Sequence, residues 1–291
     1  MTAKTPSELS DLVRGEVIDE DGADYEEARK VHNGMIDKRP AVIVRAANAG
    51  DVMNTVNYAR DNGHDLSVRG GGHSGPGFGT NDGGVVLDLS RMHGVRVDPS
   101  AQTARAEGGT TWGDFNTATN AFGLATTGGV ISTTGIAGLT LGGGIGYLSR
   151  GHGLSLDNLV SADIVTADGK MLIASEKENA DIFWAIRGGG GNFGGVTSFK
   201  YKPHPPDTVY WGPIYTEPEE TETISKFYRE YINDAPREMG AFPAFQVAPP
   251  LPFIPEDRHG DMFCAMVACW SGDPAEGEKQ FKAFHDVAEV K

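Results

Sequence analysis

The stretch S-V-R-G-G-G-H-S-G-P-G-F-G-T at residues 67–80 decides how the rest of the sequence is interpreted. Six of the ten residues from Gly70 to Gly79 are glycine, and one histidine, His73, lies among them. Successive backbone N–H groups without side chains in the way form a concave nest that binds anions. A lone histidine is more often an ordinary hydrogen-bonded residue. The neighbours of His73 expose their backbone, however, so we expect its side chain to face whatever this loop binds.

The same loop matches the dinucleotide-binding pattern G-x-G-x-x-G at residues 70–75, after an expected strand. That pattern has to open a helix on which a pyrophosphate docks. The residues that follow, G-P-G-F-G-T-N-D-G-G at 75–84, cannot form a helix. A second match, at 189–194, follows an expected helix instead of a strand. We therefore reject a nicotinamide-type Rossmann site at both places.

Two further glycine-rich segments occupy residues 128–158, with most of its glycines at 128–146, and 186–199. In all, 31 of the 40 glycines lie between residues 63 and 195. Apolar residues alternate with these glycines, which argues against a disordered tract. Each glycine costs a helix roughly 1 kcal/mol, so we expect no ordinary helix in 128–146. A backbone wrapped around a large flat ligand suits this segment better than a surface loop. For residues 186–199, a flexible hinge is an alternative to a ligand-binding loop.

The pattern of strands and short helices predicts an α+β domain at residues 36–205, after an N-terminal lead-in at 1–35 with a short helix. Glycine becomes rare after H-P-P-D at 204–207, and a second domain is expected at 206–291. Its strand–helix–strand–strand–helix pattern predicts an antiparallel sheet with helices on one face. The expected strands are 39–46, 65–70, 84–90, 94–98, 103–109, 161–175 (a hairpin), 194–203 and three in the second domain; the expected helices are 51–62, 111–121, 179–187, 219–233 and 275–290.

Charge and cysteine content restrict the partners. The net charge of −15 disfavours nucleic acid and anionic membranes. Cys264 and Cys269 lie in one expected strand, roughly 16 Å apart, so they cannot pair within it, and we expect no metal site. No apolar run is long enough for a membrane span or a signal peptide, so the expected location is the cytoplasm.

Several longer motifs occur in a fixed order: R-G-G-G-H-S, V-V-L-D-L-S, G-G-x-x-S-T-T-G-x-A-G-L-T-L-G-G-G-x-G, D-N-L, T-A-D-G and W-A-I-R-G-G-G-G-N-F-G, beginning at residues 69, 85, 128, 157, 166 and 184. In these motifs the chain resembles the FAD-linked oxidases of the vanillyl-alcohol-oxidase superfamily. More narrowly, it is similar to the berberine-bridge-enzyme-like branch, with its PCMH-type FAD domain of two subdomains. The resemblance covers about residues 36–205.

The resemblance implies FAD as the cofactor, bonded covalently through His73 to the 8α-methyl group of the isoalloxazine ring. The loop from Gly70 to Ser74 would hold the pyrophosphate, and Val196 would lie near the adenine. The flavin and its ribityl-phosphate arm would be lined by Gly135, Gly138, Gly142, Gly143 and Gly144. The implied cofactor-binding residues are Arg69, Gly70, Gly71, Gly72, His73, Ser74, Gly75, Gly79, Thr134, Gly135, Gly138, Gly142, Gly143, Gly144, Gly146 and Val196.

The chain departs from its relatives in a segment where many of them carry a second covalent tether, a cysteine in C-P-x-V-G. With the glycine aligned on Gly135, Ile131 replaces the cysteine and Thr134 replaces the valine. Ile131 has no thiol, so a single histidyl link is implied. The valine position lies near the oxygen-facing side of the flavin in relatives, and Thr134 therefore leaves the electron acceptor open.

A second departure is length. Relatives continue with more of the substrate domain and a Y-x-N-type motif whose tyrosine often acts as catalytic base. We therefore expect this chain to be C-terminally truncated and assign its base to no residue. Tyr147 is a candidate on the substrate side or a packed aromatic beside the flavin. His152 is a candidate catalytic residue or a local hydrogen-bonding one.

The function implied by this resemblance is oxidation of a small-molecule alcohol, sugar or amine. A hydride would pass to flavin N5 while a base removes a proton, and oxygen would accept the electrons as hydrogen peroxide. The alternatives are a flavin dehydrogenase that uses another acceptor and a non-catalytic, truncated flavin-binding protein. Neither the substrate nor the oligomeric state can be derived from the sequence.

Overall fold

The structure is a computed structural model that describes residues 6–205, 208–250, 252 and 254–287. The chain divides into two compact units. Unit 1 contains the residues up to 146 together with 154–205, and unit 2 contains 147–153 together with the residues from 206 onward. The predicted boundary at 204–207 includes two residues, 206 and 207, that lie outside the described part of the chain.

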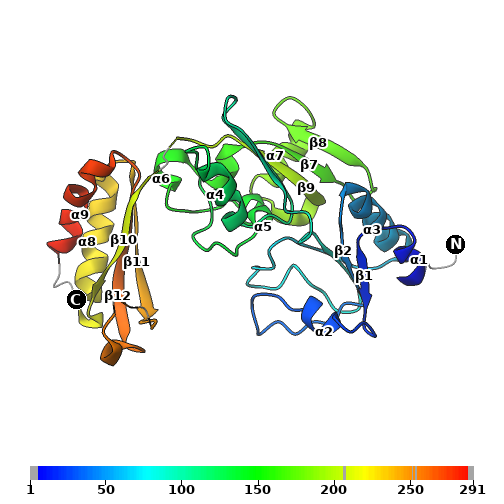
Figure 1. Ribbon diagram of the computed structural model, residues 1–291, viewed down its shortest axis with the longest axis horizontal. Coiled ribbons are helices and arrows are strands. Elements are labelled where there is room, and N and C mark those ends of the chain that lie inside the picture. Colours follow the sequence, from blue (N-terminus) through cyan, green and yellow to red (C-terminus); the bar gives the residue numbers. More distant parts are fainter. Residues whose placement is uncertain (1–5, 206–207, 251, 253, 288–291) are drawn as a thin grey trace. The chain divides into compact units, whose positions relative to one another are not determined.

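The first half of unit 1 is built around a four-stranded sheet (Figure 1). Its strands, in spatial order, are β1 (Glu16–Asp19), β2 (Val42–Arg45), β4 (Val85–Asp88) and β3 (Leu66–Arg69). The last three run parallel, and β1 is antiparallel to β2. The sequence predicted only a short helix before residue 36, and β1 was missed because its E-V-I-D sequence has a single buried side chain, Ile18.

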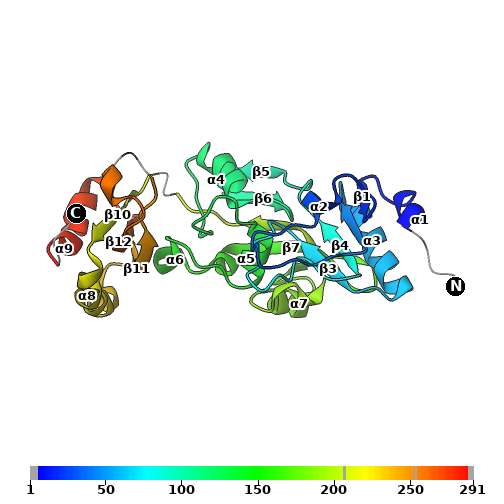
Figure 2. The same cartoon turned by 90° about the horizontal axis from the view of Figure 1, so that it is seen from below.

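Helices α1 (Pro6–Ser10), α2 (Tyr25–Ala28) and α3 (Ala49–Asn62) accompany this sheet, and Figure 2 shows α3 beside β4. The predicted helix at 51–62 is α3, and it ends at Gly63, whose φ of 68° is readily adopted only by glycine. Its buried face carries Val52 and Val56, which pack in one cluster with Leu87 of β4.

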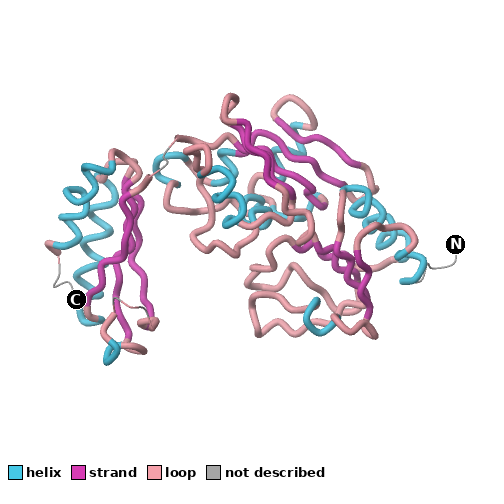
Figure 3. The backbone as a smooth tube through the Cα atoms, in the orientation of Figure 1, coloured by secondary structure: helices cyan, strands magenta, loops and turns pink. Residues whose placement is uncertain are grey.

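A five-stranded antiparallel sheet forms the second half of unit 1 (Figure 3). Its strands, in spatial order, are β5 (Val95–Asp98), β6 (Thr103–Glu107), β9 (Gly195–Tyr201), β7 (Leu159–Val165) and β8 (Met171–Ser175). Its helices are α4 (Trp112–Asn120), α5 (Ile136–Leu141) and α7 (Ala180–Ile186). Trp112, Phe115 and Tyr201 are fully buried and meet edge to face or tilted, which anchors α4 on the sheet.

Helix α5 contradicts the expectation that residues 128–146 contain no ordinary helix. It occupies the six residues between Gly135 and Gly142, which form its two ends, and it has a single internal glycine, Gly138. Ile136 and Leu141 are buried in the core of the five-stranded sheet. Tertiary packing of an apolar face supplies most helical stability in proteins, and here it outweighs the low helix propensity of glycine.

Unit 2 is a three-stranded antiparallel sheet, as predicted. Its strands, in spatial order, are β10 (Tyr210–Thr216), β12 (Met262–Trp270) and β11 (Met239–Val247). Helices α8 (Thr221–Asp234) and α9 (Gly277–His285) lie on the same face of this sheet (Figure 1). Cys264 and Cys269 are both buried and free within the described residues. Helix α9 is shorter than the expected 275–290, of which 288–290 lie outside the described residues.

A short helix, α6 (Ser149–His152), belongs to unit 2 although it is early in the chain. The guanidinium of Arg150 donates hydrogen bonds to four backbone carbonyls, those of Ile232, Ala235, Pro236 and Met239, at 2.7–3.0 Å. A helix leaves its last carbonyls without partners, so Arg150 satisfies the C-terminal end of α8. Across the described ranges, no helix combines the length and the apolar character needed to cross a membrane.

Candidate functional site

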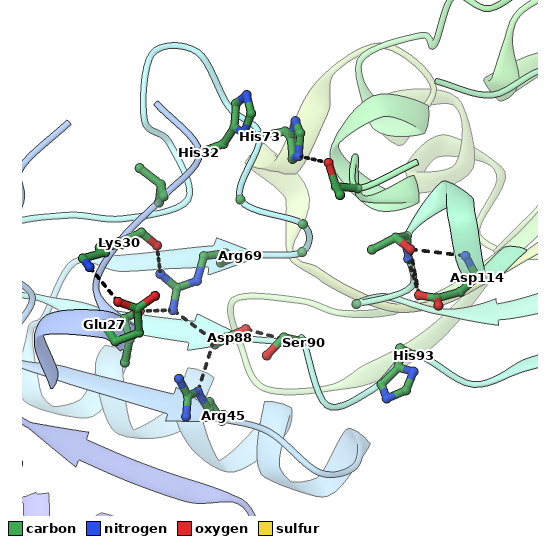
Figure 4. Close-up of a pocket in the computed structure, with 18 residues that line it drawn as sticks. Glu27, Lys30, His32, Arg45, Arg69, His73, Asp88, Ser90, His93 and Asp114 are labelled. Carbon is green, nitrogen blue, oxygen red and sulfur yellow. Dashed lines mark hydrogen bonds and ion pairs between the residues drawn. The ribbon is translucent and has the colours of Figure 1, made fainter. Parts of the chain in front are cut away.

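A cavity of about 740 Å³ lies in unit 1, beside the end of β3 (Figure 4). Its lining comes from the end of α2 and the residues after it, from the glycine loop after β3, and from the residues before and at the start of α4. Arg45 at the end of β2, Asp88 at the end of β4, Ser90, His93 and Thr133 also line it. Gly70, Gly71, Gly72 and His73, all predicted as site residues, are among its lining residues.

The glycine loop presents a row of unused hydrogen-bond donors. Within the described part of the chain, the backbone N–H groups of residues 70–74 donate no hydrogen bond. Gly72 has a φ of 69°, a conformation that side chains rarely adopt. Backbone N–H groups need partners, and a row of them beside a cavity is suited to an anionic group such as a phosphate.

Close backbone contacts bring the glycine segments together. A Cβ on Gly71 would lie 2.3 Å from the backbone nitrogen of Gly135, so residues 67–80 and 128–146 touch through their main chains. A Cβ on Gly70 would lie 3.1 Å from the carbonyl oxygen of Gly108, and one on Gly108 would lie 2.3 Å from that of Val196. The side chain of Val196 is buried in the core and does not line this cavity.

His73 is held on its edges and on one face. Its Nε2 lies 3.0 Å from the Thr133 hydroxyl and its Nδ1 lies 3.4 Å from the Thr134 hydroxyl. Its ring stacks on the ring of His32, with centroids 4.0 Å apart and planes inclined by 12°. Burial, and secondly the proximity of His32, lower the pKa of His73 below its usual value. Both effects favour the uncharged imidazole, which keeps a lone pair for bond formation.

Arg69 is engaged with the protein itself. Its guanidinium lies 2.9 Å from the carboxylate of Asp88, and both side chains are only 6% exposed. It also donates to the carbonyls of Ala28 and Lys30, at 2.7 and 3.2 Å. Arg45 lies 3.7 Å from the same carboxylate. This network ties the segment after α2 to the ends of β3 and β4, beneath the glycine loop.

Other predicted residues of the first loop have structural contacts. The Ser74 hydroxyl accepts from the backbone N–H of Phe78 at 3.1 Å. The Gly75 carbonyl accepts from the Asn33 amide at 2.8 Å. Gly79 packs beside the side chain of Arg69. None of these three residues, Ser74, Gly75 and Gly79, lines the cavity described above.

The predicted residues from Thr134 to Gly146 also lie outside the lining of this cavity. Gly138 lies within α5, and Gly142 ends that helix. Gly143 and Gly144 have φ values of 119° and 85°. A Cβ on Gly146 would lie 1.9 Å from the Gly128 carbonyl oxygen, so the two ends of this segment meet.

Tyr147, the candidate for the substrate side, and His152, the candidate catalytic or hydrogen-bonding residue, belong to unit 2. The Tyr147 ring stacks on Phe242 at 5.9 Å and meets Trp211 edge to face at 6.0 Å. The pKa of His152 is lowered by burial, and Glu238 partly opposes this effect. These contacts make Tyr147 part of an aromatic cluster on the sheet of unit 2.

The N-terminal wall of the cavity was missed by sequence reasoning. Glu27, Lys30 and His32 line it, and they lie in the segment interpreted as a lead-in. A histidine in a polar, acidic segment gives no periodic signal. Only the contact with His73, far along the chain, identifies His32 as part of the site.

Comparison with known proteins shows what the chain is similar to. Residues 40–175 match the protein family described as "FAD binding domain". The chain is 42% identical over 197 residues to (R)-6-hydroxynicotine oxidase of Paenarthrobacter nicotinovorans, covering 68% of this chain and 43% of that protein. It is 34% identical over 279 residues to an FAD-linked oxidoreductase of Aspergillus terreus, covering 95% and 56%.

Solved structures agree with this similarity. The crystal structure of 6-hydroxy-D-nicotine oxidase from Arthrobacter nicotinovorans superposes with a TM-score of 0.87 and 31% identity, covering all of this chain and 62% of that one. Xylooligosaccharide oxidase from Myceliophthora thermophila superposes with a TM-score of 0.83 and 27% identity, covering 99% and 60%. The chain thus spans about half the length of the curated relatives and about three fifths of these structures.

Proposed function

Because the chain belongs, through its FAD-binding domain, to the FAD-linked oxidases of the vanillyl-alcohol-oxidase superfamily, we propose that it is an FAD-dependent oxidoreductase of a small-molecule alcohol, sugar or amine. The resemblance noted in the sequence and the α+β, PCMH-type fold are confirmed by these matches. The activity, the substrate and the acceptor are our proposal.

A single observation carries the proposal: among the described residues, the N–H groups of residues 70–73 donate no hydrogen bond and belong to residues that line the cavity, His73 included. The donors suit the pyrophosphate of FAD, and the backbone contact of Gly71 with Gly135 keeps side chains out of this part of the site. His73, uncharged and oriented by two threonine hydroxyls, suits a covalent link to the flavin. These features support a single histidyl attachment, since Ile131 offers no second tether.

When bound, FAD would supply the hydride acceptor for the oxidation. The residues of this chain would bind and position the cofactor. The loop from Gly70 to Ser74 would hold the diphosphate, and His73 would fix the ring. The Arg69–Asp88 pair would keep that loop in place from below.

Oxygen is the acceptor we propose, because relatives named as oxidases include the nicotine and xylooligosaccharide enzymes. A dehydrogenase that uses another acceptor is the second candidate, and the observation that favours it is Thr134. Its hydroxyl lies 3.4 Å from His73, where relatives have a valine in the corresponding motif. The expected location, the cytoplasm, remains a prediction for cell fractionation to test.

The test is to denature the purified 291-residue chain in acid and to follow flavin absorbance and fluorescence. We expect flavin to stay with the polypeptide, with the mass of one FAD less two hydrogens added to the peptide that contains His73. His73→Ala should lose the covalent flavin, whereas His93→Ala, a histidine of the same cavity, should keep it. Absence of bound FAD of either kind in the wild-type protein would contradict the proposal.

The acceptor is tested separately, by reducing the bound flavin without air and then mixing it with oxygenated buffer. Fast reoxidation with formation of hydrogen peroxide supports an oxidase. Slow reoxidation with fast transfer to an artificial electron acceptor supports the dehydrogenase. Bound flavin that no alcohol, sugar or amine reduces would support a non-catalytic flavin-binding protein.

A further inference from the structure

We propose that His32 is a positioning residue for His73: its imidazole stacks on the His73 ring and holds that ring in the orientation that bonds to the flavin. The inference rests on the covalent link proposed above. It assigns a role to a residue that precedes the matched FAD-binding domain, which begins at residue 40.

The segment that carries His32 is attached to the glycine loop at several points. We call residues 28–36 the strap. The backbone N–H of His32 donates to the Gly72 carbonyl at 3.1 Å, immediately before His73. Asn33 donates to the Gly75 carbonyl at 2.8 Å. A Cβ on Gly77 would lie 2.8 Å from Ile36, so the strap and the loop are in close contact there as well.

The strap is fixed at its other end by the buried ion pair. Arg69, paired with Asp88, donates to the carbonyls of Ala28 and Lys30. Contacts before and after His32 therefore fix the position of its backbone, and its ring lies against one face of the His73 ring. Figure 4 shows the two rings next to each other above the pocket.

The remaining contacts of His73 show what the stack adds. Thr133 and Thr134 fix the two nitrogen edges of the ring, at 3.0 and 3.4 Å. A hydroxyl can donate or accept, so these two contacts alone permit the ring to turn over and exchange its nitrogens. The parallel stack at 4.0 Å covers one face and restricts that rotation. His32 next to His73 also opposes a positive charge on it, since like charges disfavour each other.

The step that His32 would assist is formation of the bond between a His73 nitrogen and the 8α-carbon of the flavin. One N–H bond of the imidazole and one C–H bond of the methyl group are broken, and one N–C bond forms. Two electrons and two protons are released overall. Dioxygen takes them up and becomes hydrogen peroxide, so the flavin ends in its oxidised form.

The experiment measures how fast the flavin-free 291-residue chain, produced in a riboflavin-starved host, attaches added FAD covalently under air. Flavin fluorescence in the denatured protein band gives the rate. His32→Ala should slow attachment by roughly 10- to 100-fold, the scale of losing alignment, whereas His32→Phe, which keeps a stacked ring, should stay within about threefold of wild type. His64→Ala is the matched control, since it removes an imidazole stacked on Tyr58.

A second measurement separates positioning from binding. His73→Ala cannot form the covalent bond, so the dissociation constant of FAD is to be compared in His73→Ala and in the double variant with His32→Ala. We expect equal constants. A loss of FAD affinity equal to the loss of rate would overturn the proposal, because His32 would then act through the general shape of the site.

The remaining outcomes are also decisive. A wild-type attachment rate in His32→Ala, or a rate in His32→Phe as low as in His32→Ala, overturns the role of the stacked ring. If wild-type protein binds FAD but releases all of it on denaturation, the covalent link and this inference fall together. If it binds no FAD at all, the proposed function fails, which is a different result.

Discussion

Replacing Gly71 by alanine tests whether the two glycine segments must touch through their backbones. The new Cβ would lie 2.3 Å from the nitrogen and 2.7 Å from the Cα of Gly135. Ordinary contact begins at 3.4 Å, so the segments would have to separate by about 1 Å. The φ of Gly71 is outside the left-handed region, and the predicted cost therefore comes from this contact alone.

Overpacking against a well-packed site costs 1–3 kcal/mol and occasionally more, and the obstacle here is main chain that no rotamer change can move. We expect Gly71→Ala to lower the free energy of unfolding of unit 1 by about 3 kcal/mol. For a unit of this size, that corresponds to a decrease in Tm of roughly 6–12 °C.

The assay is thermal unfolding of flavin-free protein, so that cofactor binding does not contribute, together with the amount of FAD retained after reconstitution. Gly138→Ala is the matched control. Its Cβ meets nothing within 4 Å and it lies inside α5, so it should leave stability unchanged or raise it by up to about 1 kcal/mol. A Tm for Gly71→Ala equal to that of wild type would refute the reasoning.

Three further predictions concern stability. Asp88→Asn should cost about 3 kcal/mol, measured as a lower urea midpoint, because it leaves the Arg69 guanidinium buried without its counter-charge; an unchanged midpoint would show that the carbonyl partners suffice. Arg150→Ala should lower the free energy of unfolding of unit 2 by about 2 kcal/mol, because four carbonyls lose their donor. Hydrogen exchange should become faster at the end of α8 while β2 and β4 of unit 1 stay protected. Equally faster exchange in both units would argue against this role of Arg150. Burial raises the pKa of Cys269 to about 11, so its thiol should resist a thiol reagent at pH 8 in the native state. Because the pKa of the Cys269 thiol is higher in the folded state, the stability that its neutral form contributes is complete below the ordinary pKa of cysteine and is lost as the pH rises toward 11. Unfolding midpoints measured between pH 8 and 11 can verify this loss.

Much of the fold follows from local signals in the sequence. The V-I-V-R and V-V-L-D runs predict buried strands, and both are fully paired in the first sheet. The apolar spacing in 51–62 and the following Gly63 predict α3 and its end. The order of the glycine motifs predicts the family, which the comparisons confirm.

The parts that sequence reasoning missed depend on contacts between distant residues. Helix α5 forms in a glycine-rich segment because Ile136 and Leu141 bury against the five-stranded sheet, which propensity does not reveal. His32 is in a polar segment without periodicity, and its stack on His73 appears only when the strap is placed on the loop. For all the residues assigned to FAD, those from Gly138 to Gly146 included, the assignment remains a prediction.

Residues 147–153 belong to unit 2, although the residues before and after them belong to unit 1. This arrangement limits how the gene can be recombined with the genes of relatives. The chain passes between the units after residues 146, 153 and 205, and Arg150 supplies hydrogen bonds to carbonyls more than eighty positions later. A gene fusion with a single junction after residue 205 would combine α6 of one protein with the rest of unit 2 of another. Arg150 would then face carbonyls other than those it binds in its own chain. Exchange of unit 2 between relatives therefore needs three junctions, after residues 146, 153 and 205, so that two segments are exchanged together, the first of them only seven codons long.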